Sequence, residues 1–282
     1  MESDFTFGIL GGTGQMGRWF EKLLQDQGHR VLVSGRRTEL TPEEMARQSH
    51  VVVLSLPLPA ALAAAETLGP LLAPDSLLMD LCSLKAEVCR KMEASTRAEV
   101  VGCHPLFGPA PESLSGQNVV LCPVRGRNWA GRLSDLFTRA GAEVQVCDPV
   151  AHDRKMALVQ AVNHFITITL ARTLHKMDLH PEEILPFSTP LFRLKLSLVG
   201  RLFAQDVRLY RDLISENPFA GDMLDRFMET AGELSGLFSG NRGDEAERLL
   251  GEVREFLGGF CETGKRKSDG CLKALDEKPG EG

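Results

Sequence analysis

Through the first 150 residues, short apolar runs alternate with longer segments whose apolar residues recur at the helical period. The runs are nearly continuous in Val, Leu and Ile, which is typical of strands covered by helices on both faces of a sheet. One helix, starting at Thr41, has a capping hydroxyl, a proline in its first turn and two acidic residues facing the helix dipole. This alternation predicts an α/β fold with a doubly wound, mainly parallel sheet of the Rossmann type. The predicted strands are 5–10, 30–34, 51–56, 76–81, 100–103, 119–122 and 143–146, and the predicted helices include 15–27, 60–72 and 128–140.

After residue 150 the pattern changes to helices alone. Segments 150–177, 189–215, 219–239 and 243–261 all have a helical period. Residues 263–282 are polar, rich in Gly and Lys and without periodicity, which is typical of a disordered tail. The sequence therefore predicts a first domain at residues 1–149, an all-helical domain at 150–262 and a tail at 263–282.

Composition and charge exclude several classes of protein. The chain has 282 residues, of which 25% are charged, and a net charge of −6. That charge argues against a nucleic-acid partner, which needs a basic face to neutralise phosphates. The most apolar stretch, residues 51–65, is interrupted by Pro57 and Pro59 and does not predict a membrane span. Seven scattered cysteines without a CxxC pair predict reduced thiols in a cytoplasmic protein, and no group of residues has the spacing of metal ligands.

The first predicted strand is followed directly by Gly-Gly-Thr-Gly-Gln-Met-Gly at residues 11–17. Its three spaced glycines form a GxGxxG motif: the first allows a tight turn, the second lets the backbone approach a pyrophosphate, and the third lets the helix pack closely on the strand. The N-terminus of the helix that follows supplies N–H groups and a positive dipole end to a phosphate. The motif predicts a dinucleotide site made by Gly12, Thr13, Gly14, Gln15, Met16 and Gly17.

The end of the second predicted strand bears on the choice of nicotinamide cofactor. An enzyme that uses NAD usually has an acidic residue there, which accepts hydrogen bonds from the ribose 2′-hydroxyl. Here the sequence is Val-Ser-Gly-Arg-Arg at residues 33–37, with no acid before Glu39. The hydroxyl of Ser34 and the cations of Arg36 and Arg37 suit a 2′-phosphate, so NADP is expected over NAD. The alternative is that both arginines belong to a solvated loop.

The fifth predicted strand leads into Gly-Cys-His-Pro-Leu-Phe-Gly-Pro at residues 102–109. His104 lies at the carboxyl end of this strand, on the edge where sheets of this kind bind ligands. The two prolines and Gly108 stiffen the segment and would hold the imidazole in place. From the residues alone, a functional and a structural role for His104 remain equally open, and Cys103 is expected to be a small apolar core residue.

Two helices of the second half are apolar almost all round, and each carries one polar stripe. The helix around residues 155–172 is therefore expected to be buried. An arginine in such surroundings needs a partner, because an unpaired buried cation is strongly destabilising. An internal acid and a bound dicarboxylate would both serve, and two stripes facing one cavity favour the ligand. His152, near a helix start, is open between capping, exposure and binding. The stripes are Gln160, Asn163, His164 and Thr167 on the first helix, and Arg193, Ser197, Arg201 and Gln205 on the second.

Several unrelated motifs, in this order, resemble those of prephenate dehydrogenases, in the branch sometimes fused to chorismate mutase. The resemblance extends from the first strand to about residue 260. Its parts are the glycine turn with Arg18 following, Asp-Leu-Cys-Ser-Leu-Lys at 80–85, residues 104–109, His152-Asp153 with His164 twelve residues later, Phe-Arg-Leu at 192–194 and Gly-Arg-Leu-Phe-Ala-Gln-Asp at 200–206.

The resemblance implies roles for single residues. His104 matches the family's catalytic histidine, which accepts the proton of the substrate's 4-hydroxyl as hydride leaves the same carbon. Ser83 matches a serine that orients this histidine. Arg201 matches the arginine that binds the ring carboxylate, His164 matches a histidine at the substrate side chain, and Arg193 is a further candidate for substrate binding on the same stripe as Arg201.

For Lys85, a substrate role implied by the resemblance and a structural salt bridge stay equally open. The helical half resembles a dimerisation domain, so a homodimer is expected. The implied reaction is the oxidative decarboxylation of prephenate to 4-hydroxyphenylpyruvate with NAD(P), in tyrosine biosynthesis, with no metal. Because the first strand begins at residue 5 and no domain follows the last helix, the chain is expected to perform the dehydrogenase step alone.

Two other functions stay open. Arogenate dehydrogenase differs only in a substrate that has an amine in place of the side-chain ketone. A non-catalytic NADP-binding regulator would use the same fold, and the pairing of His104 with Ser83 argues against it.

Overall fold

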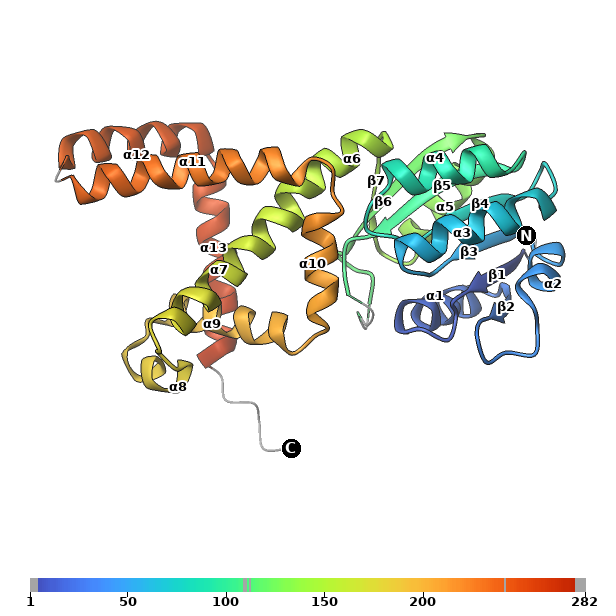
Figure 1. Ribbon diagram of the computed structural model, residues 1–282, viewed down its shortest axis with the longest axis horizontal. Helices are drawn as coiled ribbons and strands as arrows, with labels where there is room; N and C mark the ends of the chain where they lie inside the picture. Colours follow the sequence, from blue (N-terminus) through green and yellow to red (C-terminus); the bar gives the residue numbers. More distant parts are fainter. Residues whose placement is uncertain (1–4, 109–110, 112, 241, 277–282) are drawn as a thin grey trace. The chain divides into compact units, whose positions relative to one another are not determined.

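The computed structural model describes residues 5–108, 111, 113–240 and 242–276. The chain forms two compact units, Met1–Met156 and Ala157–Gly282. The first unit combines a sheet with helices, whereas the second is helical throughout its described residues (Figure 1).

The first unit is built on one seven-stranded sheet, which contains every strand that the sequence predicts. The strand order is β2-β1-β3-β4-β5-β6-β7, and all neighbours are parallel except the antiparallel pair β5–β6. The predicted fold class is therefore confirmed. The strands are β1 (Thr6–Leu10), β2 (Arg30–Ser34), β3 (Val51–Leu54), β4 (Leu77–Asp80), β5 (Glu99–Pro105), β6 (Asn118–Arg125) and β7 (Glu143–Val146).

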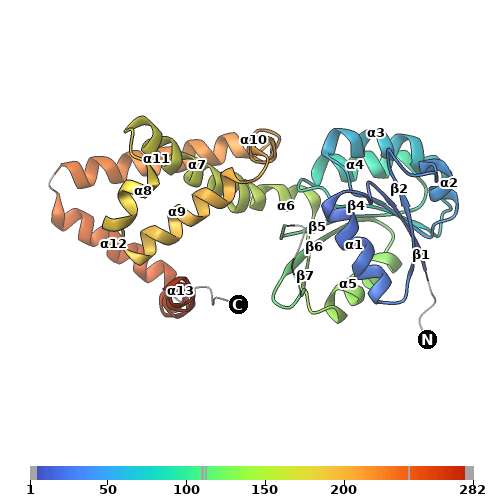
Figure 2. The same ribbon diagram turned by 90° about the horizontal axis from the view of Figure 1, so that it is seen from below.

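Helices cover both faces of this sheet (Figure 2). On one face lie α1 (Gln15–Asp26) and α5 (Asn128–Arg139). On the other lie α2 (Pro42–Arg47), α3 (Leu58–Leu68), which a 3₁₀ turn (Gly69–Leu71) extends, and α4 (Ala86–Ser95). Successive strand residues point to opposite faces, so the continuous apolar strands supply two cores.

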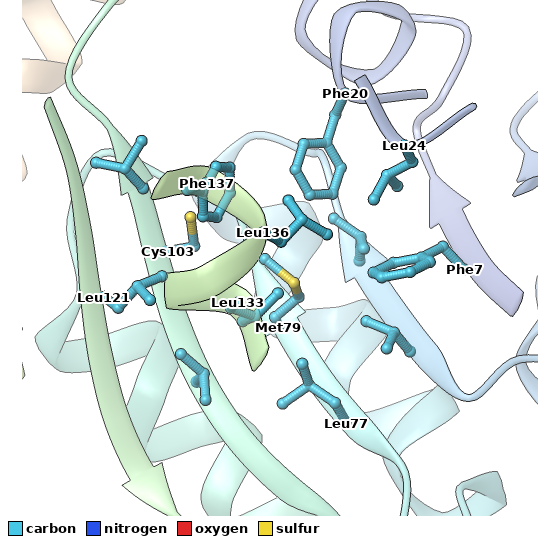
Figure 3. Close-up of a cluster of buried hydrophobic side chains, with 14 of the residues drawn as sticks. Phe7, Phe20, Leu24, Leu77, Met79, Cys103, Leu121, Leu133, Leu136 and Phe137 are labelled. Atoms are coloured by element: carbon cyan, nitrogen blue, oxygen red, sulfur yellow. The ribbon is translucent and has the colours of Figure 1, made fainter. Parts of the chain in front are cut away.

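The core beneath α1 and α5 is shown in Figure 3. There Phe20 of α1 and Phe137 of α5 belong to the same buried cluster as Phe7, Met79 and Cys103 of the strands. Cys103 is fully buried, and this burial raises the pKa of its thiol. The expectation that Cys103 is an apolar core residue is confirmed. All seven cysteines are free thiols in the structure.

Local signals account for the start of α2 but not for that of α4. The capping hydroxyl expected at α2 is that of Thr41, and Glu44 completes a capping box with it: each side chain bonds the other residue's backbone N–H, at 3.2 Å and 3.1 Å. Helix α4 was not predicted, because its first residues carry no capping side chain of their own. Its N-terminus is capped by the Asp153 carboxylate, 68 residues further along the chain from Lys85.

The second compact unit begins at Ala157. The sequence predicts a domain boundary after residue 149, and α6 (Pro149–Met156), which follows that boundary, packs against α4 and is part of the first compact unit. Beyond it lie a π-helix (Ala157–Val162), α7 (Asn163–Lys176), α8 (Pro181–Ile184), a 3₁₀ turn (Leu185–Phe187), α9 (Pro190–Phe203), α10 (Val207–Ser215), α11 (Ala220–Ser239), α12 (Gly243–Leu257) and α13 (Phe260–Asp276). The segment predicted as one helix over 189–215 is divided at Asp206, whose side chain caps α10 by accepting the Arg208 N–H at 3.0 Å.

Two further expectations about the second half are wrong. The predicted tail at 263–282 is helical as far as Asp276, because α13 packs against α9; residues 277–282 lie outside the described part of the chain. The helix around 155–172 was expected to be buried, but Leu158, Val159 and Ile166 are about half exposed. A single copy of the chain offers these side chains no covering surface. Among the described residues, no helix is both long and apolar enough to span a bilayer.

Candidate active site

The carboxyl end of β5 carries His104 into a buried position. The strand alternation that sends Cys103 into the core beneath α1 and α5 turns Gly102 and His104 toward α4. A side chain at Gly102 would collide with Cys89 and with the stem of Lys85, since a Cβ placed there lies 2.4 Å from the Cys89 Sγ. Because Gly102 has no side chain, the Lys85 side chain has space to reach the carboxyl end of β5.

Lys85 is fully buried and forms an ion pair with Asp80, the last residue of β4. Its ammonium also donates to the Cys103 carbonyl at 3.0 Å. Burial is the largest single influence and opposes the charged form of the lysine, but the charge and hydrogen bond of Asp80 together with the neighbouring Cys82 and Cys89 raise the pKa of Lys85. Of the two roles left open for Lys85, the geometry matches the salt bridge: its charge is used inside the protein.

His104 is hydrogen-bonded to a second buried histidine. The Nδ1 of His104 lies 2.9 Å from the Nε2 of His152, and the Nδ1 of His152 lies 2.7 Å from a carboxylate oxygen of Asp153. Asp153 in turn accepts the backbone N–H groups of Lys85 and Ala86 at 2.8 Å each. All these residues belong to the first unit, and His152 and Asp153 are only 1% exposed.

Sequence reasoning missed the pairing of these residues, although the signal was present. His152-Asp153 stands among the matched motifs, but its position near a helix start suggested capping or exposure equally well. Asp153 does cap a helix, namely α4 rather than its own, while His152 is buried.

The surroundings of His104 favour its neutral form. Burial lowers the pKa of His104 well below 6.5, and the charge of Lys85 acts in the same direction, as would a proton on His152. A neutral imidazole at the ligand-binding edge of a sheet can accept a proton at neutral pH, as a general base does. Ser83 lies half-buried on the loop between β4 and α4, two residues before Lys85.

The glycine turn after β1 has the geometry that a dinucleotide requires. Gly11 has a φ of 86°, in the left-handed region, and a Cβ there would lie 2.2 Å from the Ser55 carbonyl. A Cβ on Gly17 would lie 2.6 Å from the Gly12 Cα, so this glycine sets the close approach of α1 to the turn. Gly14 is the N-cap of α1, and Thr13, Gly14 and Gln15 are exposed there. Met16, half-buried, completes the predicted set, which therefore fits a pyrophosphate at the N-terminus of α1.

The loop after β2 adjoins this turn, because a Cβ on Gly35 would lie 3.2 Å from the Thr13 hydroxyl. Arg36 and Arg37 are exposed on that loop. Ser34, predicted to bind the cofactor, is fully buried, and its hydroxyl donates to the Leu40 carbonyl at 2.8 Å. Its hydroxyl thus holds the loop in shape, and of the three residues predicted to bind the cofactor on this loop only the two arginines are exposed.

In the second unit, the two predicted polar stripes meet at Tyr210 of α10. The His164 ring of α7 packs edge-on against the Tyr210 ring, with centroids 4.8 Å apart. Burial raises the pKa of Tyr210, while the charge of Arg201 and a hydrogen bond from Gln205 act against this. Burial also lowers the pKa of His164. Tyr210 was missed because a lone tyrosine in an amphipathic helix carries no motif.

The placement of the arginines differs from the expectation. Arg201 and Arg193 of α9 were expected to be buried, but both are exposed, and Arg193 lies two turns before Arg201. The stripe on the preceding helix is also interrupted, because the π-helix at Ala157–Val162 changes the angular spacing between Gln160 and His164. Pro109 of the His104 segment lies outside the described residues, among which no group of His, Cys, Asp and Glu could hold a metal ion.

The carboxyl ends of β1 and β5 lie on one edge of the sheet, since these strands run in the same direction. The dinucleotide turn therefore shares that edge with a buried, neutral histidine. This combination defines a nicotinamide-dependent dehydrogenase.

Comparison with known proteins specifies the class further. Residues 24–146 match the nucleotide-binding domain of prephenate dehydrogenase, and residues 148–252 match its dimerization domain. The chain belongs to the prephenate dehydrogenase family, whose members are NAD(P)-dependent oxidoreductases, and the expected family, enzyme class and function are confirmed at this level.

The chain is 34% identical to the T-protein of Enterobacter agglomerans, over 88% of its length and 70% of that protein. It is 28% identical to a probable arogenate/prephenate dehydrogenase of Methanocaldococcus jannaschii, over 97% of its length and 66% of that protein. The chain thus spans about two thirds of the length of these relatives. Its fold matches that of a prephenate dehydrogenase from A. aeolicus, in complex with hydroxyphenyl propionate and NAD+, with a TM-score of 0.74 at 21% identity, covering 89% of this chain and 96% of that one.

Proposed function

We propose that this chain converts prephenate to 4-hydroxyphenylpyruvate by oxidative decarboxylation, with His104 as the general base. The observation that carries the proposal is the burial of His104, beside the Lys85 charge, at the sheet edge that also holds the dinucleotide turn. Family membership supports the substrate class.

In this mechanism His104 accepts the proton of the substrate's 4-hydroxyl, so that the oxygen can form a carbonyl. A nicotinamide held at the glycine turn would supply the acceptor for the hydride that leaves the same carbon. The bond to the ring carboxylate then breaks, CO2 leaves, and the electron pair of that bond completes the aromatic ring. The oxygen at the former carbonyl carbon takes the proton back from His104, which gives the phenol of the product. Since aromatisation supplies the driving force, the protein has to orient the reactants and manage one proton.

The remaining site residues have supporting roles in the proposal. Arg201 binds the ring carboxylate as an exposed cation at the Tyr210 cluster, and His164 contacts the substrate side chain. Ser83 orients His104 from the β4–α4 loop. Arg193 is exposed on the same helix as Arg201 but is the weaker candidate for substrate binding. The charge of Arg201 lowers the pKa of Tyr210, which places Arg201 near that cluster.

For the cofactor we propose NADP, on the ground that Arg36 and Arg37 are exposed beside the glycine turn and no acidic residue lies between the start of β2 and Glu39. Exposed arginines of this kind recognise a phosphate through bidentate hydrogen bonds.

We further propose that the protein is a homodimer in the cytoplasm. Leu158, Val159 and Ile166 are exposed in a region that matches a dimerization domain, and the seven cysteines are free thiols. Sedimentation at micromolar concentration should give twice the mass of 30.9 kDa. A stable, active species of 30.9 kDa would exclude the dimer.

One experiment tests the function. The purified chain is incubated with prephenate or arogenate and with NADP or NAD, and the reduced nicotinamide is followed by absorbance. Prephenate with NADP should give the highest kcat/KM, and His104→Asn should lower kcat by about 10²–10⁴, the usual contribution of a general base. A preference for arogenate would mean that arogenate and not prephenate is the substrate. Cofactor binding without turnover of either substrate would indicate a regulator.

A further inference from the structure

Two side chains, His152 and Asp153, are joined to His104 by hydrogen bonds, and the proposed reaction does not by itself require either of them. His104, His152 and Asp153 are 4%, 1% and 1% exposed, so the three side chains are closed off from water. The two hydrogen bonds that join them measure 2.9 Å and 2.7 Å. Their order is His104 Nδ1, His152 Nε2, His152 Nδ1 and the Asp153 carboxylate.

The direction of these hydrogen bonds can be deduced from the carboxylate end. Asp153 accepts the Lys85 and Ala86 N–H groups, one at each oxygen, and an ionised carboxylate can only accept. His152 must therefore donate from Nδ1. In a neutral His152 the Nε2 then carries a lone pair and accepts, so His104 must donate from its own Nδ1.

We propose that Asp153 and His152 are positioning residues, which fix His104 in the tautomer that carries its proton on Nδ1 and presents an unprotonated Nε2 to the substrate's hydroxyl. The inference rests on the proposed role of His104 as the base. A base must offer a lone pair at the reacting nitrogen, and Nδ1 is already engaged with His152.

The same hydrogen bonds also stabilise His104 after it has accepted the proton. Once His104 has accepted the proton at Nε2, its cation still donates from Nδ1 to His152, and the Asp153 charge lies at the far end of these hydrogen bonds. The charged groups around the two rings are Lys85 and Asp80, which are paired with each other, and Asp153. A buried aspartate that orients a catalytic imidazole through the opposite ring nitrogen is a known solution in serine proteases; here a second histidine is placed between the two.

Nitrogen NMR of the protein with ¹⁵N-labelled histidine tests the tautomer directly, without substrate. The His104 signals, assigned by their loss in His104→Asn, should show a protonated Nδ1 and an unprotonated Nε2. Asp153 Oδ1 accepts both the Lys85 N–H and His152 Nδ1, while Oδ2 accepts the Ala86 N–H. In Asp153→Asn the NH2 group takes the place of one of these oxygens, and where it replaces Oδ1 it faces His152 Nδ1. Both histidines should then change tautomer, which places the proton of His104 on Nε2.

The kinetic prediction follows from that change. Asp153→Asn should lower kcat by about 10²–10⁴-fold, the loss that follows when a catalytic histidine is held in the wrong tautomer. The KM for prephenate should be nearly unchanged. His152→Gln keeps an acceptor for His104 Nδ1 and should retain more kcat than His152→Leu, which has none. In the His152→Gln background, Asp153→Asn should add little further loss of kcat, because its effect passes through His152.

Asp153 also caps α4, so thermal unfolding is measured for each variant to separate stability from positioning. Wild-type His104 with its proton on Nε2, in a protein that turns over prephenate, would overturn the inference. Folded Asp153→Asn and His152→Leu proteins with normal kcat would overturn it as well. An Nδ1-protonated His104 in a protein that turns over neither substrate would instead refute the proposed function and leave the hydrogen-bond order intact.

Discussion

Removing the charge of Lys85 tests which of its two candidate roles is correct. Lys85→Met keeps most of the length of the side chain but leaves Asp80 as a buried carboxylate without its ion-pair partner. The Oδ1 atom of Asp80 already has no hydrogen-bond partner among the described residues, and its Oδ2 would keep only the Cys82 N–H at 2.8 Å.

The magnitude of the effect follows from that burial. Breaking a fully buried ion pair by removing one partner typically lowers the free energy of unfolding by about 3–5 kcal/mol. A natural domain has roughly 5–15 kcal/mol in total, so the variant should be severely destabilised. Asp80→Asn combined with Lys85→Met should regain most of this loss, because the neutral amide can still accept from Cys82.

A second effect concerns His104. The Lys85 charge contributes to the lowered pKa of His104, so its removal should raise that pKa. The acid limb of the kcat/KM profile should then move to higher pH in the double variant. Urea unfolding followed by circular dichroism measures the first effect, and the pH dependence of kcat/KM measures the second.

The result that would refute this reasoning is specific. If Lys85→Met loses less than about 1 kcal/mol of stability, the value for an exposed ion pair, and shows only a raised KM for prephenate, then Lys85 binds substrate. The ammonium of Lys85 would then have to leave its buried position when substrate binds.

Three further predictions follow. Because the pKa of His104 lies below 6.5 in the folded protein, the unfolded state takes up the proton first, and stability should be full above about pH 6.5 and fall below it. His104 alone can change the free energy of unfolding by at most about 1.4 kcal/mol per pH unit. Comparing the wild type with His104→Gln separates this contribution from that of His164. Identical dependence of stability on pH in the two proteins would refute the prediction. Arg36→Ala combined with Arg37→Ala should raise the KM for NADP and leave that for NAD nearly unchanged, and a wild-type enzyme that prefers NAD would contradict the assignment. Arg201→Gln should raise the KM for prephenate by about 30-fold or more if the arginine pairs with a carboxylate shielded from water, while Arg193→Gln serves as the control on the same helix; equal effects of both, or a raised KM for the cofactor, would count against the placement.

The sequence alone was enough for features that depend on neighbouring residues. Continuous apolar runs predicted inner strands such as β3 and β4, because a strand buried on both faces needs apolar residues at every position. The edge strand β7, Glu-Val-Gln-Val, was predicted although it is largely exposed. The helix start at Thr41 and the glycine turn were predicted correctly because the geometry of each is set within a few residues. The family resemblance selected His104 from a segment that pattern alone left ambiguous.

The tertiary structure decided everything that depends on which distant residues meet. Only the folded chain brings Asp153 to the start of α4, closes Lys85 onto Asp80 and directs the Ser34 hydroxyl to Leu40. A hydroxyl or an ammonium carries the same chemistry whether it is buried or exposed, so its sequence position does not say which it will be.

The reverse holds for the apolar side chains of the second unit. Their pattern predicted burial, yet Leu158 and Val159 are exposed, since burial depends on a covering surface and not on the residue itself. The polar segment predicted as a tail forms α13, because packing against α9 stabilises a helix that its own composition does not predict. Local preferences therefore fixed the elements and the glycine turn, while contacts between residues far apart in the chain fixed the charge, burial and hydrogen bonding of the site.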